Sequence, residues 1–229
     1  MVTDSLRALI GTEDTTEFID PEPRWPAFVA VFAVGGIYTA LPDFLTLGPR
    51  WLYPCLVLAL LLPTIVSHHT GRHRLNMIFG FLVDGLLTVG LIISVILLIG
   101  ALPSHTESPV ALLLSAASLW LTNILVFALW YWRLDAGGPH QRDKRAGHAE
   151  GAFLFPQMTM SEAALIEAHQ EDWSPNFVDY LFLAFNTSTA FSPTDVPVLA
   201  RWGKILMMLQ SLLSLLIIAL LAARAVNML

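Results

Sequence analysis

The residues best suited to lining a path for an ion lie together in the stretch NTSTAFSPTD, from Asn186 to Asp195. Half of them carry a hydroxyl group, and the last carries a carboxylate. Such oxygens suit a wide, polar pore, and an acid at its mouth favours cations. The candidate residues are Thr187, Ser188, Thr189, Ala190, Phe191, Ser192, Pro193, Thr194 and Asp195.

Three further polar residues, Asp84, Asn123 and Gln210, stand inside strongly apolar runs. An acid within a membrane helix is costly and is by default a functional candidate. For Asp84 the alternative is a hydrogen-bonded position between helices or near interfacial water. Asn123 and Gln210 are expected to form hydrogen bonds between helices. Asp179, near the start of a short helix, is expected to interact favourably with the helix dipole.

Other chemistries find little support in the sequence. His69 and His73 have a spacing that would suit a metal on a helix, but Gly71 between them favours a turn in an interfacial loop. Hydrolase, metalloprotease and nucleotide-binding motifs are absent. The only cysteine, Cys55, excludes an internal disulfide, and the net charge of −6 offers no basic surface to nucleic acid. We therefore expect no enzyme, no cofactor, no metal site and no nucleic-acid partner.

The composition indicates a membrane protein, since 55% of the residues are hydrophobic, only 13% are charged, and the mean hydropathy is +0.65. A helix needs about 20 apolar residues to cross a bilayer. The apolar runs are continuous rather than alternating, which excludes a membrane β-barrel. The predicted fold class is an all-α polytopic membrane protein with about five transmembrane helices, at 25–45, 51–67, 76–102, 109–132 and 203–226.

The remaining segments have distinct characters. Residues 1–24 form an acidic N-terminal arm, and 133–175 form a long polar loop. Thr159 and Glu162 have the spacing of a capping box, which predicts a short helix at about 160–170. The apolar part of 176–189 is too short to span, and Pro193 prevents its continuation as a helix. We therefore expect a half-helix that enters the membrane, followed by a strip at 190–195 that returns to the same surface.

This order of elements resembles the pore of the tetrameric cation channels. The stretch YLFLAFNTSTAFSPTD aligns without a gap with the potassium-channel pore helix and filter, and PVLARWGK resembles the turn into the inner helix. The chain also resembles an uncharacterised family of bacterial inner-membrane proteins with such a C-terminal part. The resemblance implies a homotetramer and a three-helix peripheral membrane bundle at 25–102. It also implies a pore-like module at 109–229, made of an outer helix (109–132), the polar loop (133–175), a pore helix with a filter-like strip (176–195) and an inner helix (203–226).

The filter itself departs from the potassium-channel pattern. That pattern is TVGYG, whose carbonyl oxygens replace the water shell of the ion. This chain has Ala190, Phe191, Ser192, Pro193 and Thr194 instead, so both glycines and their conformational freedom are lost. We predict no ordinary potassium selectivity. Two options follow: a wider pore lined by hydroxyl groups with an acidic ring at Asp195, or a pore closed by Phe191.

The predicted function is a channel-like, cation-conducting protein of the bacterial inner membrane, with membrane lipids and copies of itself as partners. One alternative is a non-conducting scaffold or accessory protein, and another is a proton-coupled small-solute transporter that uses Asp84.

Five spans and six spans both fit the sequence. With five, one side holds ten of the twelve Lys and Arg residues. The positive-inside rule makes that side cytoplasmic, whereas the channel layout makes it external.

Overall fold

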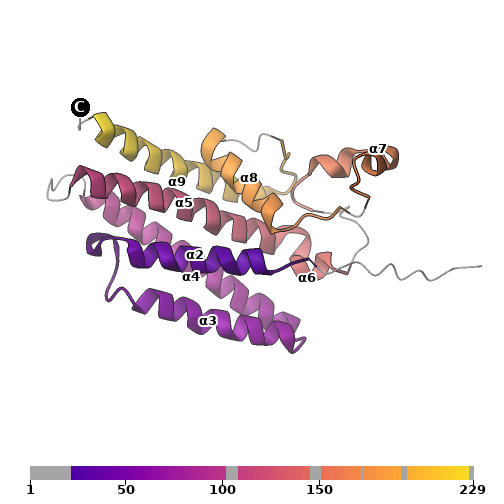
Figure 1. The fold of residues 1–229 in the computed structure, drawn as a ribbon, viewed down its shortest axis with the longest axis horizontal. Coiled ribbons are helices and arrows are strands. Elements are labelled where there is room, and N and C mark those ends of the chain that lie inside the picture. The colour runs from indigo at the N-terminus through magenta and orange to yellow at the C-terminus, as the bar shows by residue number, and fades with distance from the viewer. Residues whose placement is uncertain (1–21, 102–107, 145–150, 172, 192–194, 227–229) are drawn as a thin grey trace, which may run out of the picture.

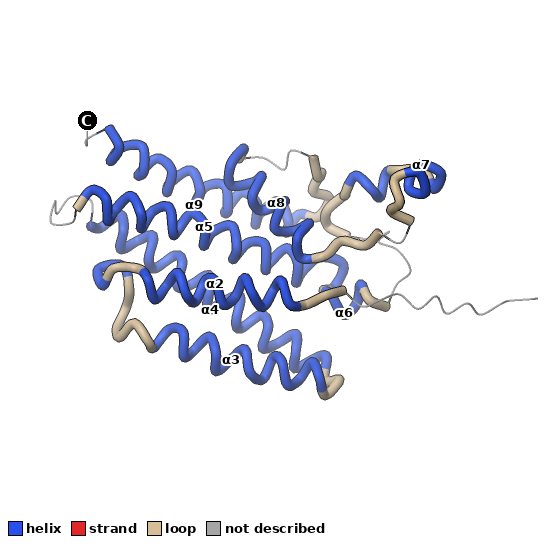
Figure 2. The backbone as a smooth tube through the Cα atoms, viewed as in Figure 1, coloured by secondary structure: helices blue, strands red, loops and turns tan. Residues whose placement is uncertain are grey.

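The computed structural model is helical almost throughout (Figures 1 and 2). It describes residues 22–101, 108–144, 151–171, 173–191 and 195–226. In chain order the helices are α2 (Trp25–Ala40), η1 (Asp43–Leu45), α3 (Leu52–His69), α4 (His73–Ala101), α5 (Pro109–Leu134), η2 (Asp135–Gly137), α6 (Pro139–Arg142), η3 (Pro156–Thr159), α7 (Glu162–Glu167), α8 (Phe177–Ala190) and α9 (Arg201–Val226).

Four helices are long and apolar enough to cross a membrane, namely α3, α4, α5 and α9. The fold is therefore that of a multi-pass helical membrane protein. The first of the five expected spans is the exception, because α2 has 16 residues and is about 24 Å long at 1.5 Å per residue. Pro42 explains its end, since a proline drives the preceding residue out of the helical region, and Leu41 is extended with ψ 146°.

Helix α5 lies in the middle of the bundle (Figures 1 and 2). Helices α8 and α9 pack on one side of it, while α2 and α4 pack elsewhere on its surface and α3 lies against α4. The outer faces of α4 and α9 expose large apolar side chains, among them Ile96 at 60% and Leu212 at 62%. Apolar outer faces around a core with polar contacts suit a lipid environment.

The α3–α4 hairpin is held by a close aromatic contact. The ring of Tyr53 on α3 occupies the space beside Gly90 on α4, where a Cβ atom would lie 2.5 Å from the ring. The same ring stacks on Tyr38 of α2 with a centroid distance of 4.0 Å. The turn between the helices contains Gly71 at φ +67°, as expected from the HHTGRHR stretch.

The polar connection after α5 contains short helices. The helix expected at 160–170 is α7, but its predicted cap is wrong. The Ser161 hydroxyl, not Thr159, accepts the hydrogen bond from the Ala164 amide, at 3.3 Å. Thr159 instead donates to the Pro156 carbonyl at 2.7 Å and closes η3. Glu162 is consequently the first residue of α7 rather than its third.

Candidate pore segment and the polar contacts that hold it

Helix α8 begins with a reciprocal cap. The Asn176 side chain accepts from the Val178 amide at 2.8 Å, and the Asp179 carboxylate accepts from the Asn176 amide at 2.8 Å. These contacts satisfy amides that have no partner within the helix. Asp179 therefore has a local structural role at the helix start.

The other end of α8 is fixed by Gln210 of α9, which is fully buried. Its Nε2 atom donates to the Ala184 carbonyl at 2.7 Å and to the Ser188 hydroxyl at 2.8 Å. Its Oε1 atom accepts from the Tyr131 hydroxyl of α5 at 2.5 Å. One amide side chain thus joins three helices, which strongly constrains where α8 can lie.

Four further contacts complete this polar network. Nδ2 of Asn123 on α5 donates to the Gln210 carbonyl at 3.3 Å and lies 3.4 Å from the Ser188 hydroxyl. The Ser214 hydroxyl of α9 donates to the Ser188 carbonyl at 2.7 Å and accepts from Nε1 of Trp120 at 3.0 Å. The side chains of Asn123 and Gln210 are therefore used for contacts between helices.

The structure places the predicted pore residues in different surroundings. Thr187 and Ser188 are fully buried, whereas Thr189, Ala190, Phe191 and Asp195 are exposed. The Thr187 hydroxyl donates to Leu183 at 2.8 Å and the Thr189 hydroxyl to Phe185 at 3.0 Å, both within α8. Phe191, at φ +55°, ends the helix in the left-handed conformation. The remaining candidates, Ser192, Pro193 and Thr194, lie outside the described residues.

After α8 the chain comes back to the end of the bundle where α8 began. At that end, Asp135 follows α5 and its carboxylate accepts from the Tyr180 hydroxyl of α8 at 2.7 Å. The same carboxylate accepts from the Ala152 amide at 2.5 Å, and the Ala152 carbonyl accepts from Leu199 at 2.8 Å. Ser188, by contrast, meets Asn123 about halfway along α5. Helix α8 therefore reaches only the middle of the bundle.

A groove of about 500 Å³ runs along the junction of α8 and α9. Thr187 and Phe191 contribute to one wall, and Lys204, Met208 and Ser211 of α9 contribute to the other. The groove is mainly apolar, and its polar lining residues include Lys204 and Ser211 of α9. It adjoins the exposed residues at the end of α8.

Asp84 has a partner that the sequence analysis did not identify. Nε of Arg133, in the last turn of α5, lies 2.5 Å from the Asp84 carboxylate, and the Asp84 side chain is fully buried. Gly80 makes room for this contact, because a Cβ atom there would overlap the Arg133 guanidinium. A useful signal was present in the sequence, since an intramembrane acid needs a countercharge and Arg133 directly follows an apolar run.

A second buried ion pair closes the end of the bundle near Asp135. Arg142 donates to the carbonyls of Trp132 and Asp135 at 2.8 and 2.9 Å, and to the Glu22 carboxylate at 2.8 Å. Glu22 also accepts a hydrogen bond from the Trp132 indole. The guanidinium of Arg142 lies over the Tyr180 ring, 5.1 Å from its centroid. These contacts connect the segment before α2 to α5, α6 and α8.

Burial raises the pKa of Glu22, and the positive charge and hydrogen bonds of Arg142 offset this only in part. The carboxyl therefore binds a proton more readily in the folded chain than when it is exposed to water. The group lies before α2, outside the membrane-spanning helices.

Among the residues that the structure describes, no group of three or more His, Cys, Asp or Glu side chains is placed to hold a metal ion. No protein-family model matches the chain, and comparisons with curated proteins and with solved structures found no match.

Proposed function

We propose that this chain forms a homotetrameric, cation-conducting pore in a bacterial inner membrane, with selectivity unlike that of potassium channels. The supporting observation is that α8 ends halfway along α5 and the chain returns to the end where α8 began. Irregular backbone at membrane depth is tolerated only when protein buries it or it lines a wet cavity. A shared pore around a symmetry axis would provide such a cavity.

The charges near this segment shape the expected selectivity. Asp195 is exposed at the end of the strip at 190–195 and supplies negative charge, whereas Lys204 of α9 lines the groove. Cation preference in this proposal requires that the negative charge of Asp195 act on ions in the pore more strongly than the positive charge of Lys204. Asp84 is less suited to coupling a proton to transport, because Arg133 already pairs with it.

Current through planar bilayers containing the purified full-length chain tests the proposal. Wild-type protein should conduct, Asp195→Asn should reduce the preference for cations over anions, and Lys204→Gln should increase it. Glu162→Gln is the matched control, because it removes an exposed acid on α7 and should change nothing. Absence of current from correctly folded protein would favour the scaffold alternative and overturn the conduction proposal.

The axial arrangement can be tested by cross-linking. In a Cys55→Ser background, Phe191→Cys should form disulfide-linked dimers readily, because copies of the α8 end would meet near the axis. Ile96→Cys, on the exposed outer face of α4, should form few. Equal cross-linking at both positions, or a monomer by native mass spectrometry, would argue against a shared pore.

A further inference from the structure

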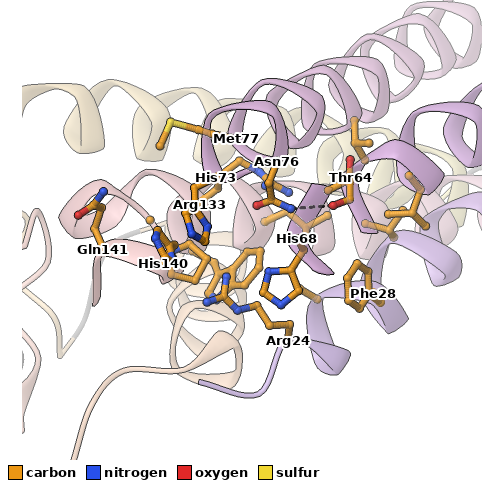
Figure 3. Close-up of a pocket in the computed structure, with 18 of the residues that line it drawn as sticks. Arg24, Phe28, Thr64, His68, His73, Asn76, Met77, Arg133, His140 and Gln141 are labelled. Atoms are coloured by element: carbon orange, nitrogen blue, oxygen red, sulfur yellow. Dashed lines mark hydrogen bonds between the residues drawn. The ribbon is translucent and has the colours of Figure 1, made fainter. Parts of the chain in front are cut away.

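A separate cavity of about 130 Å³ lies where α2 and α4 begin and α3 and α5 end (Figure 3). Its polar wall contains six basic side chains and, among its lining residues, no carboxylate. In Figure 3 several of these side chains converge in the centre of the view. The basic residues are Arg24, His68, His73, Arg74, Arg133 and His140.

Two of the three imidazoles that line the cavity are closely paired. The rings of His73 on α4 and His140 on α6 stack with a centroid distance of 3.3 Å and an interplanar angle of 14°. Nε2 of His140 is buried and has no hydrogen-bond partner among the described residues. Buried polar side-chain atoms nearly always form a hydrogen bond in native proteins. A bound ligand with acceptor oxygens would provide one when the imidazole is protonated or carries its proton on Nε2.

The charge of the cavity is only partly compensated. Arg24 pairs with Asp143, and Arg133 pairs with Asp84. For Arg74, by contrast, the described part of the chain offers no carboxylate partner. A guanidinium without a carboxylate partner among the described residues makes this cavity attractive to an anion.

The rest of the cavity lining includes a group of apolar residues. Phe28 and Val31 of α2, Leu61 of α3 and Val83 of α4 form this group together with Leu129 of α5. In Figure 3, Phe28 lies beside His68, so apolar and basic surfaces adjoin. The cavity lies at the ends of helices that span a membrane, which is the depth of lipid head groups. Basic pockets between helices at this depth suit anionic lipid head groups.

We infer that this cavity binds the phosphate of an anionic membrane lipid, with the start of an acyl chain against its apolar residues. The basic side chains recognise the phosphate, and the apolar residues distinguish a lipid from a free phosphate. The site requires that the chain lie in a membrane but does not depend on conduction. It is separated from the α8–α9 groove, with which it shares no lining residue.

Native mass spectrometry of the full chain in detergent, titrated with phosphatidylglycerol or phosphatidylcholine, tests this site. The wild-type chain should bind phosphatidylglycerol more tightly than phosphatidylcholine. Arg74→Gln should weaken phosphatidylglycerol binding about fivefold, as expected for the loss of one favourable basic contact. His140→Gln should also weaken it. Arg72→Gln is the matched control, because Arg72 is exposed two residues away and does not line the cavity.

The lipid assignment is overturned if the wild-type chain binds both lipids equally, or if Arg72→Gln weakens binding as much as Arg74→Gln. Inorganic phosphate is titrated in a separate experiment to distinguish the two phosphate sources. Weak binding of inorganic phosphate, with phosphatidylglycerol retained, supports the lipid. Displacement of phosphatidylglycerol by millimolar-range inorganic phosphate would identify the site as one for a soluble phosphate and overturn the inference.

Discussion

Asp84 and Arg133 form an ion pair in which each buried charge needs the other as its countercharge. Burying a single charge in an apolar bundle is unfavourable, and pairing it removes much of the penalty. Arg133 reaches Asp84 from the last turn of α5, and its side chain is only 10% exposed. The contact therefore connects α4 and α5 through a largely buried ion pair.

Asp84→Asn should destabilise the protein by about 3–5 kcal/mol, because it leaves the Arg133 guanidinium buried without a countercharge. Thermal unfolding in detergent measures the loss. Asp43→Asn removes the carboxylate of the exposed pair with Arg50 and should cost less than about 1 kcal/mol. Adding Arg133→Gln to Asp84→Asn should restore part of the stability. Equal effects of the two acid substitutions would contradict the structural role of the pair.

Gln210→Leu should lower stability by about 1–3 kcal/mol, since the Tyr131 hydroxyl and the Ala184 carbonyl would lose their buried partner. Ser211→Ala, at the adjacent position on α9, is the control and should have little effect. Chemical unfolding followed by tryptophan fluorescence measures both variants. A Gln210→Leu variant as stable as Ser211→Ala would show that the network contributes nothing.

Helix boundaries were largely predictable, because a helix that spans a membrane requires a long run of apolar residues. The expected span at 109–132 corresponds to Pro109–Leu134, and the expected half-helix at 176–189 corresponds to Phe177–Ala190. Contacts between helices were not predictable from a single sequence. Asp84 and Arg133 are 49 positions apart, and Tyr131 and Gln210 are 79 apart, so no local pattern relates them. The polar side chains were recognised as candidates, but their partners depend on the tertiary packing.

The α3–α4 pair is expected to be sensitive to a single methyl group. Gly90→Ala should destabilise the protein by about 1–3 kcal/mol, because the added Cβ would overlap the Tyr53 ring. Gly85→Ala, on the same helix, meets nothing within 4 Å and should be neutral or stabilising. Thermal unfolding of the two variants in detergent compares them directly. A neutral Gly90→Ala variant would show that Tyr53 can move away without cost.

The assembled bundle is fastened at one end by a dense set of polar contacts. Glu22, Arg142, Asp135 and Tyr180 come from three separated parts of the chain and meet beside the end of α5. The chain between α8 and α9 attaches to the same place, because the Leu199 amide donates to the carbonyl of Ala152, whose own amide donates to Asp135. The position of the candidate pore segment is therefore coupled to the segment before α2.

Glu22 should make stability depend on pH. Because its pKa is raised in the folded chain, its contribution is greatest below its ordinary value of 4.5 and is lost as the pH rises through the folded pKa. Relative to wild type, Glu22→Gln should consequently become more stable as the pH increases from below 4.5 to neutrality. Unfolding temperatures of both proteins across this range measure the difference. The exposed Glu162→Gln control should show no such trend, and a constant difference for Glu22→Gln would contradict the shift.

The position of α5 also has a consequence for biosynthesis. Asn123 and Tyr131 emerge from the ribosome well before Gln210, the residue on α9 with which both form hydrogen bonds. A chain stopped before Arg201 would therefore lack the Gln210 partner of the Tyr131 hydroxyl and of the Asn123 amide, so the native polar network can close only after α9 has been made.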